Sequence, residues 1–241
     1  MIIIPAIDLL DGKCVRLYQG DYAKADKVAS DPVETALRFL DEGATHLHVV
    51  DLDGAREGRQ RNFHILEQLA NLGLTVQTGG GIRNIDSVKD CFAAGVNSVI
   101  IGSAAVSDKA FLENALSLYP ERIIAGVDAK FGYVRTSGWL EDSGLYYLDF
   151  AEQLEKLGIK RIIYTDISRD GTLEGVNIAH LTALKERVNC HLIASGGVRD
   201  MDDINALLEQ NVYGAICGKS LYSGSLSLKA AIERTKCYQR E

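Results

Sequence analysis

Hydrophobic residues form short β-branched runs along the chain, and these runs alternate with amphipathic stretches of about ten residues. Such alternation predicts repeated βα units, in which successive strands pair in parallel and helices cover the sheet. The eight predicted strands span residues 2–8, 46–51, 75–78, 98–101, 123–128, 161–165, 191–194 and 214–217. Eight consecutive units favour an α/β fold that closes as a (β/α)8 (TIM) barrel, with an open doubly wound sheet as the alternative.

The stretch that begins at Pro32 shows the helical pattern. Val33, Ala36, Leu37 and Leu40 recur at the spacing of one helix face, and proline is favoured in the first turn of a helix. We therefore expect a helix here, with these four side chains as its apolar stripe and Gly43 at its end.

The length of the chain fits one domain. Its 241 residues lie near the roughly 250 residues that are typical of one such barrel. No linker, low-complexity tract or shift of composition divides the sequence. We therefore predict that residues 1–241 form a single (β/α)8-barrel domain.

Composition and charge exclude several classes of partner. Hydrophobic residues make up 46% and charged residues 24% of the chain, and no apolar run approaches the ~18 residues that cross a membrane. The net charge of −7 and the lack of a basic cluster disfavour nucleic acid. Residues 1–5 lack the basic leader of a signal peptide, so they are expected to begin the first strand. We expect neither a membrane nor a nucleic-acid partner.

The five cysteines are scattered and include no CxxC pair. They therefore predict neither a disulfide framework nor a zinc site. A reducing cytoplasm fits this cysteine usage best.

Two segments of the chain repeat each other in register. The segment TGGGIRNID, which begins at Thr78, matches ASGGVRDMD, which begins at Ala194. The same shift of 116 residues carries Gly102 onto Gly218, one βα unit further along the chain. A repeat of about half the chain predicts two similar half-barrels of four units each, related by a pseudo-twofold axis.

The repeated segments predict two phosphate sites. A glycine directly after a strand lets the backbone approach a ligand, and the helix that follows presents free N–H groups and a positive dipole end. One site is predicted at Gly80, Gly81, Arg83, Gly102 and Ser103. The other is predicted at Gly196, Gly197, Gly218, Lys219 and Ser220. The alternative is that the glycines only make tight turns, but four loops in register favour a substrate with a phosphate at each end.

Aspartates end several predicted strands. Asp8 and Asp128 end the first and fifth strands, which the repeat makes counterparts, so their carboxylates are expected to face each other across the mouth. That arrangement lets one carboxylate remove a proton from carbon while the other protonates a leaving oxygen. Asp170 rivals Asp128 as the acid, but its loop would have to fold over the substrate, so Asp128 is favoured. The alternative role of a strand-end aspartate is to cap a helix or pair with a lysine.

A histidine and a tryptophan are further candidates for ligand contacts. His46 and His48 share one face of a strand, but no other histidine ends a strand, so a positioning role for His48 is favoured over a metal site. The loop after the fifth strand carries Trp139, the only tryptophan. Its ring is predicted to stack on a planar ligand as part of a lid, or else to anchor the loop on the barrel rim.

Six motifs occur in an order that is known from one enzyme family. They are PAIDL from Pro5, VRLYQG from Val15, VDLDGA from Val50, GGGIR from Gly79, SGW from Ser137 and TDISRDGT from Thr165. Through them the chain resembles, over essentially its whole length, the phosphoribosylformimino-aminoimidazole carboxamide ribotide isomerases of histidine biosynthesis.

The resemblance implies an Amadori rearrangement, in which an aminoaldose opens its ring and becomes an aminoketose without a metal or an organic cofactor. It also implies the catalytic roles: Asp8 would be the base, Asp128 the acid with Asp170 as a second candidate, and Thr165 would assist nearby. Trp139 would stack on the aminoimidazole carboxamide ring. Arg16 and Gly20 would belong to a first loop that closes over the substrate.

Three other functions compete with this one. The sister cyclase subunit of imidazole glycerol phosphate synthase shares the twin phosphate sites, but it typically has a lysine where this chain has Tyr18 and Gln19, and it lacks the SGW motif. A dual-substrate isomerase that also serves tryptophan synthesis stays open on sequence alone. A non-catalytic sugar-phosphate binding protein would have no need of opposed aspartates. We expect a cytoplasmic, monomeric isomerase whose partner is a small substrate with two phosphates.

Overall fold

The computed structural model describes residues 1–238 and contains eight parallel strands that close into a barrel. In chain order they are β1 (Ile2–Leu10), β4 (His46–Asp51), β5 (Thr75–Gly79), β6 (Ser98–Ile101), β7 (Ile123–Lys130), β10 (Arg161–Asp166), β11 (His191–Ser195) and β12 (Gly214–Cys217). Each strand pairs with the next one along the chain, and pairing of β12 with β1 closes the ring. All eight predicted strands are present, and the (β/α)8 barrel is confirmed over the open sheet.

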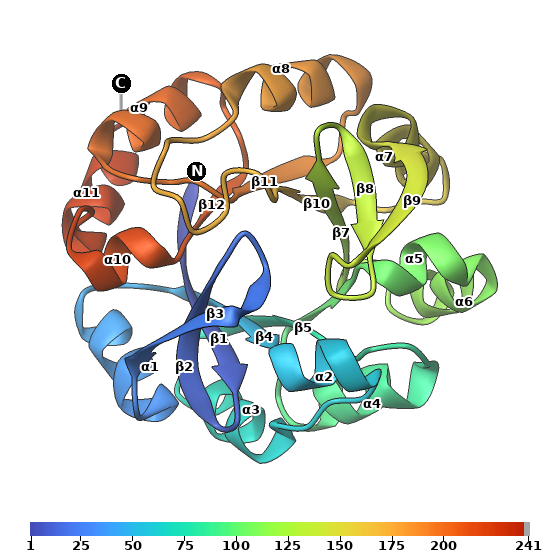
Figure 1. Ribbon diagram of the computed structural model, residues 1–241, viewed down its shortest axis with the longest axis horizontal. Helices are drawn as coiled ribbons and strands as arrows, with labels where there is room; N and C mark the ends of the chain where they lie inside the picture. Colours follow the sequence, from blue (N-terminus) through green and yellow to red (C-terminus); the bar gives the residue numbers. More distant parts are fainter. Residues whose placement is uncertain (239–241) are drawn as a thin grey trace.

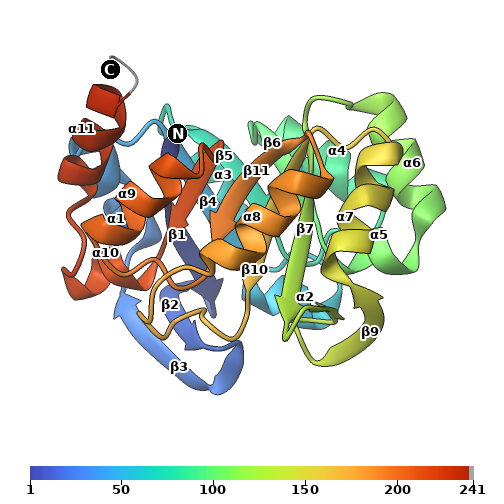
Figure 2. The same ribbon diagram turned by 90° about the horizontal axis from the view of Figure 1, so that it is seen from above.

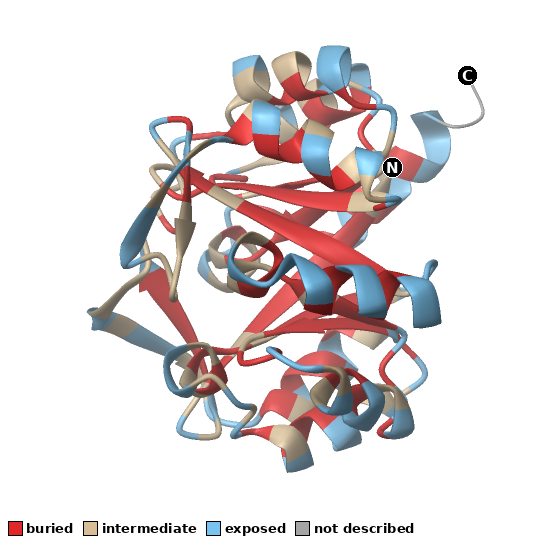
Figure 3. Ribbon diagram, turned by 90° about the vertical axis from the view of Figure 1, so that its right-hand side faces the viewer, coloured by how far each residue is buried: buried red, intermediate tan, exposed pale blue. Residues whose placement is uncertain are grey.

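Helices surround the barrel and present their exposed faces outward (Figures 1 and 3). They are α1 (Pro32–Asp41), α2 (Leu52–Glu57), α3 (Phe63–Ala70), α4 (Ile85–Ala93), α5 (Ser103–Ser107), α6 (Lys109–Leu118), α7 (Tyr147–Lys156), α8 (Ile178–Arg187), α9 (Met201–Glu209), α10 (Lys219–Ser223) and α11 (Leu228–Tyr238). Among the described residues, no helix combines the length and the apolar character that crossing a membrane requires.

Helix α1 corrects the predicted apolar stripe. Its buried residues are Pro32, Thr35, Ala36 and Phe39, whereas Leu37 is 43% exposed. The phenyl ring of Phe39 is only 1% exposed, and burying so large a ring removes more apolar area from water than burying leucine at position 37 would. The helix is therefore turned toward Phe39, and the prediction for Leu37 was wrong.

The apolar core has an outer and an inner part. The larger part lies between the strands and the surrounding helices. The smaller part fills the barrel and consists of Ile4, Ala6, Ile124, Ile163, Ile193 and Ile216. This inner cluster forms a packed floor, so a ligand has access only to the ends of the barrel.

The half-barrel repeat is visible in the element boundaries. A shift of 116 residues carries Thr75–Gly79 (β5) onto His191–Ser195 (β11) and Ile85–Ala93 (α4) onto Met201–Glu209 (α9). The short helix α5 coincides with α10 under the same shift. The two segments that repeat in sequence therefore adopt the same secondary structure.

Two hairpins extend the barrel at one end. After β1 come β2 (Lys13–Tyr18) and β3 (Asp21–Ala29), and after β7 come β8 (Tyr133–Thr136) and β9 (Glu141–Tyr146). Figure 2 shows both hairpins at the end toward which the barrel strands point. The loop after the fifth barrel strand, predicted as a polar lid, is thus an antiparallel hairpin with a short tip.

Candidate active site

A cavity at the carboxyl ends of the strands brings the predicted catalytic and substrate-binding residues together. Its lining includes Asp8, Arg16, Gly20, His48, Asp128, Trp139, Thr165 and Asp170. These residues come from β1, β2, β4, β7, β10 and the loops between them. Ala6, Ile163 and Ile216 of the inner apolar cluster also line this cavity.

Asp8 lies on β1 and forms an ion pair with Arg16 of β2. The distance from Arg16 Nη1 to Asp8 Oδ2 is 2.8 Å, and the carboxylate is only 15% exposed. The antiparallel register of β1 and β2 places Asp8 opposite Val15, so Arg16 follows directly beside it. Burial raises the pKa of Asp8, and the positive charge of Arg16 opposes this shift.

Asp128 lies on β7, across the barrel from β1. Trp139 Nε1 donates a hydrogen bond to Asp128 Oδ2 at 2.9 Å, and the Thr165 side chain, whose residue pairs with Asp128 in the sheet, forms a second one. Burial raises the pKa of Asp128, while these two hydrogen bonds lower it. An indole N–H only donates, so the contact with Trp139 favours the ionised carboxylate.

Asp170 lies on the loop that follows β10. The backbone N–H of Asp170 donates to the carbonyl of Asp166 at 3.0 Å, which closes a turn in the loop, and Asp170 lines the cavity. Burial raises the pKa of Asp170 to about 6; Arg16 opposes the shift, and the charges of Asp8 and Asp128 add to it. A carboxyl group with such a pKa retains its proton closer to neutral pH than an ordinary aspartate does.

Two other strand-end aspartates have structural roles. Asp51 accepts hydrogen bonds from the Gly54 N–H at 2.9 Å and from Asn62 Nδ2 at 2.8 Å. In the other half-barrel, Asp166 accepts one from Asn177 Nδ2 at 2.7 Å. Both are buried, and neither lines the cavity. They hold the loops after β4 and β10, which is the capping role that was the alternative for strand-end aspartates.

His48 is buried beside Gln77 of the neighbouring strand. Gln77 Nε2 lies 3.1 Å from His48 Nδ1. Burial lowers the pKa of His48 to about 3, and Arg16 adds to the effect, so the imidazole is neutral at pH 7. His46 does not line the cavity. Within residues 1–238, no group of three histidine, cysteine or acidic side chains is arranged to hold a metal ion.

Trp139 and Gly20 bring the tips of the two hairpins together. Gly20 has a φ of +76°, and a Cβ atom built there would overlap the six-membered ring of Trp139. Both residues line the cavity. The indole therefore anchors one hairpin against the other and also forms part of the cavity wall.

The predicted phosphate loops lie in two cavities. Gly80, Gly81, Arg83, Gly102 and Ser103 line the cavity of the three carboxylates. Gly196, Gly197, Gly218 and Lys219 line a second, smaller cavity. Ser220 does not line it, and its buried hydroxyl oxygen has no hydrogen-bond partner among residues 1–238. Arg16 and Asp170 line both cavities, so they lie between the two phosphate loops.

The glycines of these loops are required by the backbone itself. Gly80 has a φ of +95°, and a Cβ atom there would overlap the carbonyl oxygen of Asp51. Its repeat mate Gly196 has a φ of +85°, and a Cβ atom would lie 2.7 Å from the carbonyl oxygen of Asp166. The tight-turn interpretation therefore holds for both, and the same tight packing fixes the position of each loop above its strand.

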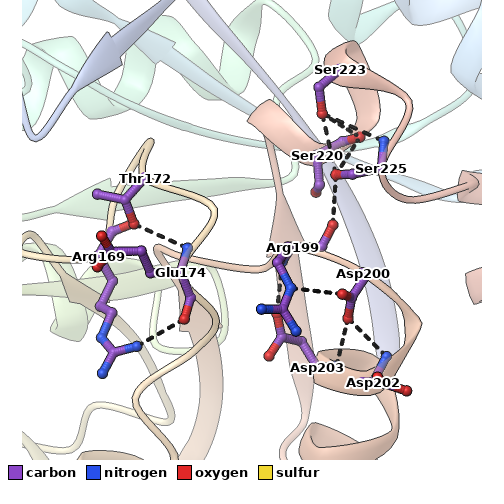
Figure 4. Close-up of polar contacts among 10 residues, drawn as sticks. All are labelled: Arg169, Thr172, Glu174, Arg199, Asp200, Asp202, Asp203, Ser220, Ser223 and Ser225. Carbon is purple, nitrogen blue, oxygen red and sulfur yellow. Dashed lines mark hydrogen bonds and ion pairs between the residues drawn. The ribbon is translucent and has the colours of Figure 1, made fainter.

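The two repeat arginines differ in orientation. Arg83 lines the larger cavity. Arg199 instead directs its guanidinium toward Asp200, with Nε 2.6 Å from the carboxylate, as Figure 4 shows. On that side Lys219 is the cation of the loop, and its Nζ donates to the carbonyl oxygen of Gly171 at 2.7 Å.

Sequence reasoning missed three residues of the site. Gln77 contacts His48, Ser195 lines both cavities, and Gln19 contacts the loop of Asp170. Gln77 lies directly opposite His48 in the β4–β5 register. Aligning these two neighbouring predicted strands would therefore have placed Gln77 beside His48. No local pattern pointed to Gln19.

Comparison with known proteins gives a consistent result over nearly the whole chain. The profile of the histidine biosynthesis protein family matches residues 2–227. A Clostridium kluyveri protein (strain ATCC 8527) is 50% identical over 97% of this chain and 98% of its own. Proteins of Clostridium botulinum (strain Hall) and Clostridium novyi (strain NT) are each 47% identical over 97% of this chain, and over 97% and 98% of their own. All three are named 1-(5-phosphoribosyl)-5-((5-phosphoribosylamino)methylideneamino)imidazole-4-carboxamide isomerase.

Proposed function

The chain belongs to the histidine biosynthesis protein family, and we propose that it catalyses the isomerisation for which its relatives are named, with the aspartates of the barrel mouth as acid and base. The observation that carries the proposal is the position of these carboxylates between two glycine loops related by the repeat. The substrate in the relatives' name carries two phosphoribosyl groups. A protein that binds both phosphates holds the reacting ribose beside the carboxylates.

The reaction requires two proton transfers on that ribose. Protonation of the ring oxygen opens the aminoaldose and leaves a cationic imine. Removal of the proton from the neighbouring carbon then gives an enaminol, which becomes the aminoketose. A general acid on one side and a general base on the other are sufficient for both steps, and neither step requires a metal or an organic cofactor.

Asp8 is the base in this proposal. Its ion pair with Arg16 keeps the carboxylate available as a proton acceptor, because the guanidinium offsets the effect of burial on the pKa. Its place on β1 holds it rigidly at the rim, which suits a group that must lie close to one carbon atom.

The acid is Asp128 or Asp170, and two observations support Asp170. Burial raises the pKa of both carboxyl groups, but the hydrogen bond from Trp139 opposes the shift at Asp128, whereas the pKa of Asp170 is raised to about 6. The loop movement that counted against Asp170 is also less of an obstacle, since Asp170 already lines the cavity. In this assignment Asp128, held by Trp139 and Thr165, stabilises the cationic imine.

The remaining residues of the cavity bind and orient the substrate. The neutral imidazole of His48 is a hydrogen-bonding group for a ribose hydroxyl. The indole of Trp139 offers a flat surface for the carboxamide ring, and Arg16 with Gly20 closes the first hairpin over it. Gly80, Gly102 and their repeat mates receive the phosphates.

The comparisons favour this isomerase over the cyclase subunit and the non-catalytic binding protein. We propose in addition that the enzyme acts as a monomer in the cytoplasm, without nucleic acid or membrane. The net charge of −7 supports the lack of a nucleic-acid partner.

A spectrophotometric isomerase assay on the purified protein tests the proposal. The substrate is the carboxamide with two phosphoribosyl groups, and the expected result is turnover that requires no added metal or cofactor. Asp8→Asn is the negative control. Failure of the wild-type protein to convert this substrate would refute the proposal, and turnover of the corresponding tryptophan-pathway aminoaldose would show a second activity.

A further inference from the structure

The turn that joins β2 to β3 contains a glutamine where its geometry favours a different residue. Tyr18 pairs with Asp21 across the hairpin, so the turn consists of Gln19 and Gly20. Both have positive φ values, +50° and +76°. Two-residue turns of this kind favour asparagine, aspartate or glycine at the first position, because these residues tolerate the left-handed region. Local turn chemistry therefore does not explain Gln19.

The contacts of Gln19 with the loop after β10 do explain it. Its side-chain Nε2 donates to the carbonyl oxygen of Ser168 at 2.8 Å, and its backbone N–H donates to the carbonyl oxygen of Asp170 at 3.1 Å. The loop is also packed against the hairpin, because a Cβ atom at Gly171 would overlap the carbonyl oxygen of Leu17. Gln19 thus holds the loop on both sides of residue 169.

The reach of the side chain is the property that distinguishes glutamine here. Asparagine carries the same amide on a chain that is one methylene shorter, which brings it about 1.5 Å less far. It would fit the turn better but would lose the hydrogen bond to Ser168. Position 19 therefore carries glutamine, which reaches Ser168, and not asparagine, which fits the turn better.

We infer that Gln19 is a positioning residue that holds Asp170 over the substrate cavity. The inference rests on the proposed function, in which Asp170 takes part in proton transfer. Gln19 does not line either cavity, so its effect on the reaction passes through the loop that it holds. The first hairpin thereby determines the position of a carboxylate from the other half of the barrel.

Gln19→Asn separates the two roles of this position. Because asparagine suits the turn, the melting temperature is expected to stay the same or rise. Loss of one hydrogen bond should lower kcat about tenfold, with KM within about threefold of wild type. The control is Gln68→Asn on the exposed face of α3, which makes the same chemical change away from the site and should leave kcat unchanged.

A double-mutant cycle shows whether the effect passes through Asp170. In the Asp170→Asn background, measured with enzyme in excess so that a slow rate is visible, Gln19→Asn should cause no further loss. A purely structural defect would reduce the rate in both backgrounds. Retention of wild-type kcat within twofold by Gln19→Asn, or an equal loss in both backgrounds, would overturn the inference.

Hydrogen exchange tests the contact itself without a substrate, so it separates this inference from the proposed isomerase activity. In Gln19→Asn the amides of Asp170 and Thr172, which are bonded within the loop, should exchange about three- to tenfold faster. The amide of Gly58, which is bonded to Gly54 at the end of α2, should be unchanged. Unaltered exchange at Asp170 would refute the positioning role even in a fully active enzyme.

Discussion

Trp139 and Arg16 give the three carboxylates of the mouth different properties. Arg16 pairs with Asp8, Trp139 donates to Asp128, and no comparable donor contacts the side chain of Asp170 within the described part of the chain. Because a donor that lies beside a carboxylate favours its ionised form, this difference supports the proposal that Asp170 releases the proton.

Asparagine substitutions at Asp128 and Asp170 test this assignment. Asp170→Asn should slow turnover of the closed ribose form by about 100-fold or more, because a positioned general acid contributes at least this much. Asp128→Asn keeps an oxygen for Trp139 and should cause a smaller loss. The substrate Kd is measured separately, so that damaged binding is not mistaken for lost chemistry. If Asp128→Asn were the inactive variant and Asp170→Asn the active one, the roles would be reversed.

The raised pKa of Asp170 also predicts a pH-dependent stability. The folded state binds this proton more tightly than the unfolded chain, in which an aspartate has an ordinary pKa of 3.8, so stability falls as the pH rises from about 4 through about 6 and then levels off. Asp170→Asn removes the charge that burial disfavours. Urea unfolding should therefore find the variant more stable than wild type at pH 8 and indistinguishable from it at pH 4. An equal difference at both pH values would contradict the shifted pKa.

At the scale of elements, the loops after the strands are fixed by backbone packing as much as by hydrogen bonds. The loop after β5 rests on the end of β4, and the loop after β11 rests on the end of β10. The two hairpins meet at Gly20 and Trp139 above them. Each half-barrel thus supplies one hairpin and the two glycine loops of one predicted phosphate site, and these elements surround the two cavities.

Gly80→Ala and Gly43→Ala measure this packing. The two glycines have nearly equal φ values, +95° and +98°, but a Cβ atom at Gly80 would overlap the backbone of Asp51, whereas one at Gly43 would meet nothing within 4 Å. Gly43→Ala should lower the free energy of unfolding by about 1 kcal/mol, the cost of the backbone conformation alone. Gly80→Ala should lower it by at least about 3 kcal/mol, because a steric clash adds to that cost. If denaturant unfolding gave equal losses of unfolding free energy for the two variants, the loop after β5 would be able to move away from the added methyl group at no cost.

At the scale of the whole molecule, the repeat predicts two anion sites, one in each of two cavities that share Arg16 and Asp170. A crystal soaked in phosphate or sulfate should contain one anion near Gly81 and Gly102–Ser103 and another near Gly197 and Gly218–Ser220. Binding of both is expected because the loops share their element boundaries and glycine conformations. If saturating phosphate gave an anion at one rim only, the loops at the other rim would share the fold of the repeat but would not bind phosphate.

Local sequence information determined much of the fold and of the site. The eight barrel strands could be predicted from β-branched runs, because a buried strand requires apolar residues that are adjacent in the sequence. The glycine loops and the strand-end aspartates could be predicted because each directly follows or ends a predicted strand. A residue at the carboxyl end of a barrel strand lies at the mouth whatever the rest of the chain does.

Tertiary structure decided the features that depend on distant residues. Gln19 and Ser168 are separated by 149 positions, and no sequence pattern near either residue predicts their hydrogen bond. The same holds for the rotation of α1 toward Phe39 and away from Leu37, which depends on the surface that receives the helix. The sequence placed Asp8, Asp128 and Asp170 at one end of the barrel, but their different chemistry arises from the side chains that packing brings to each of them.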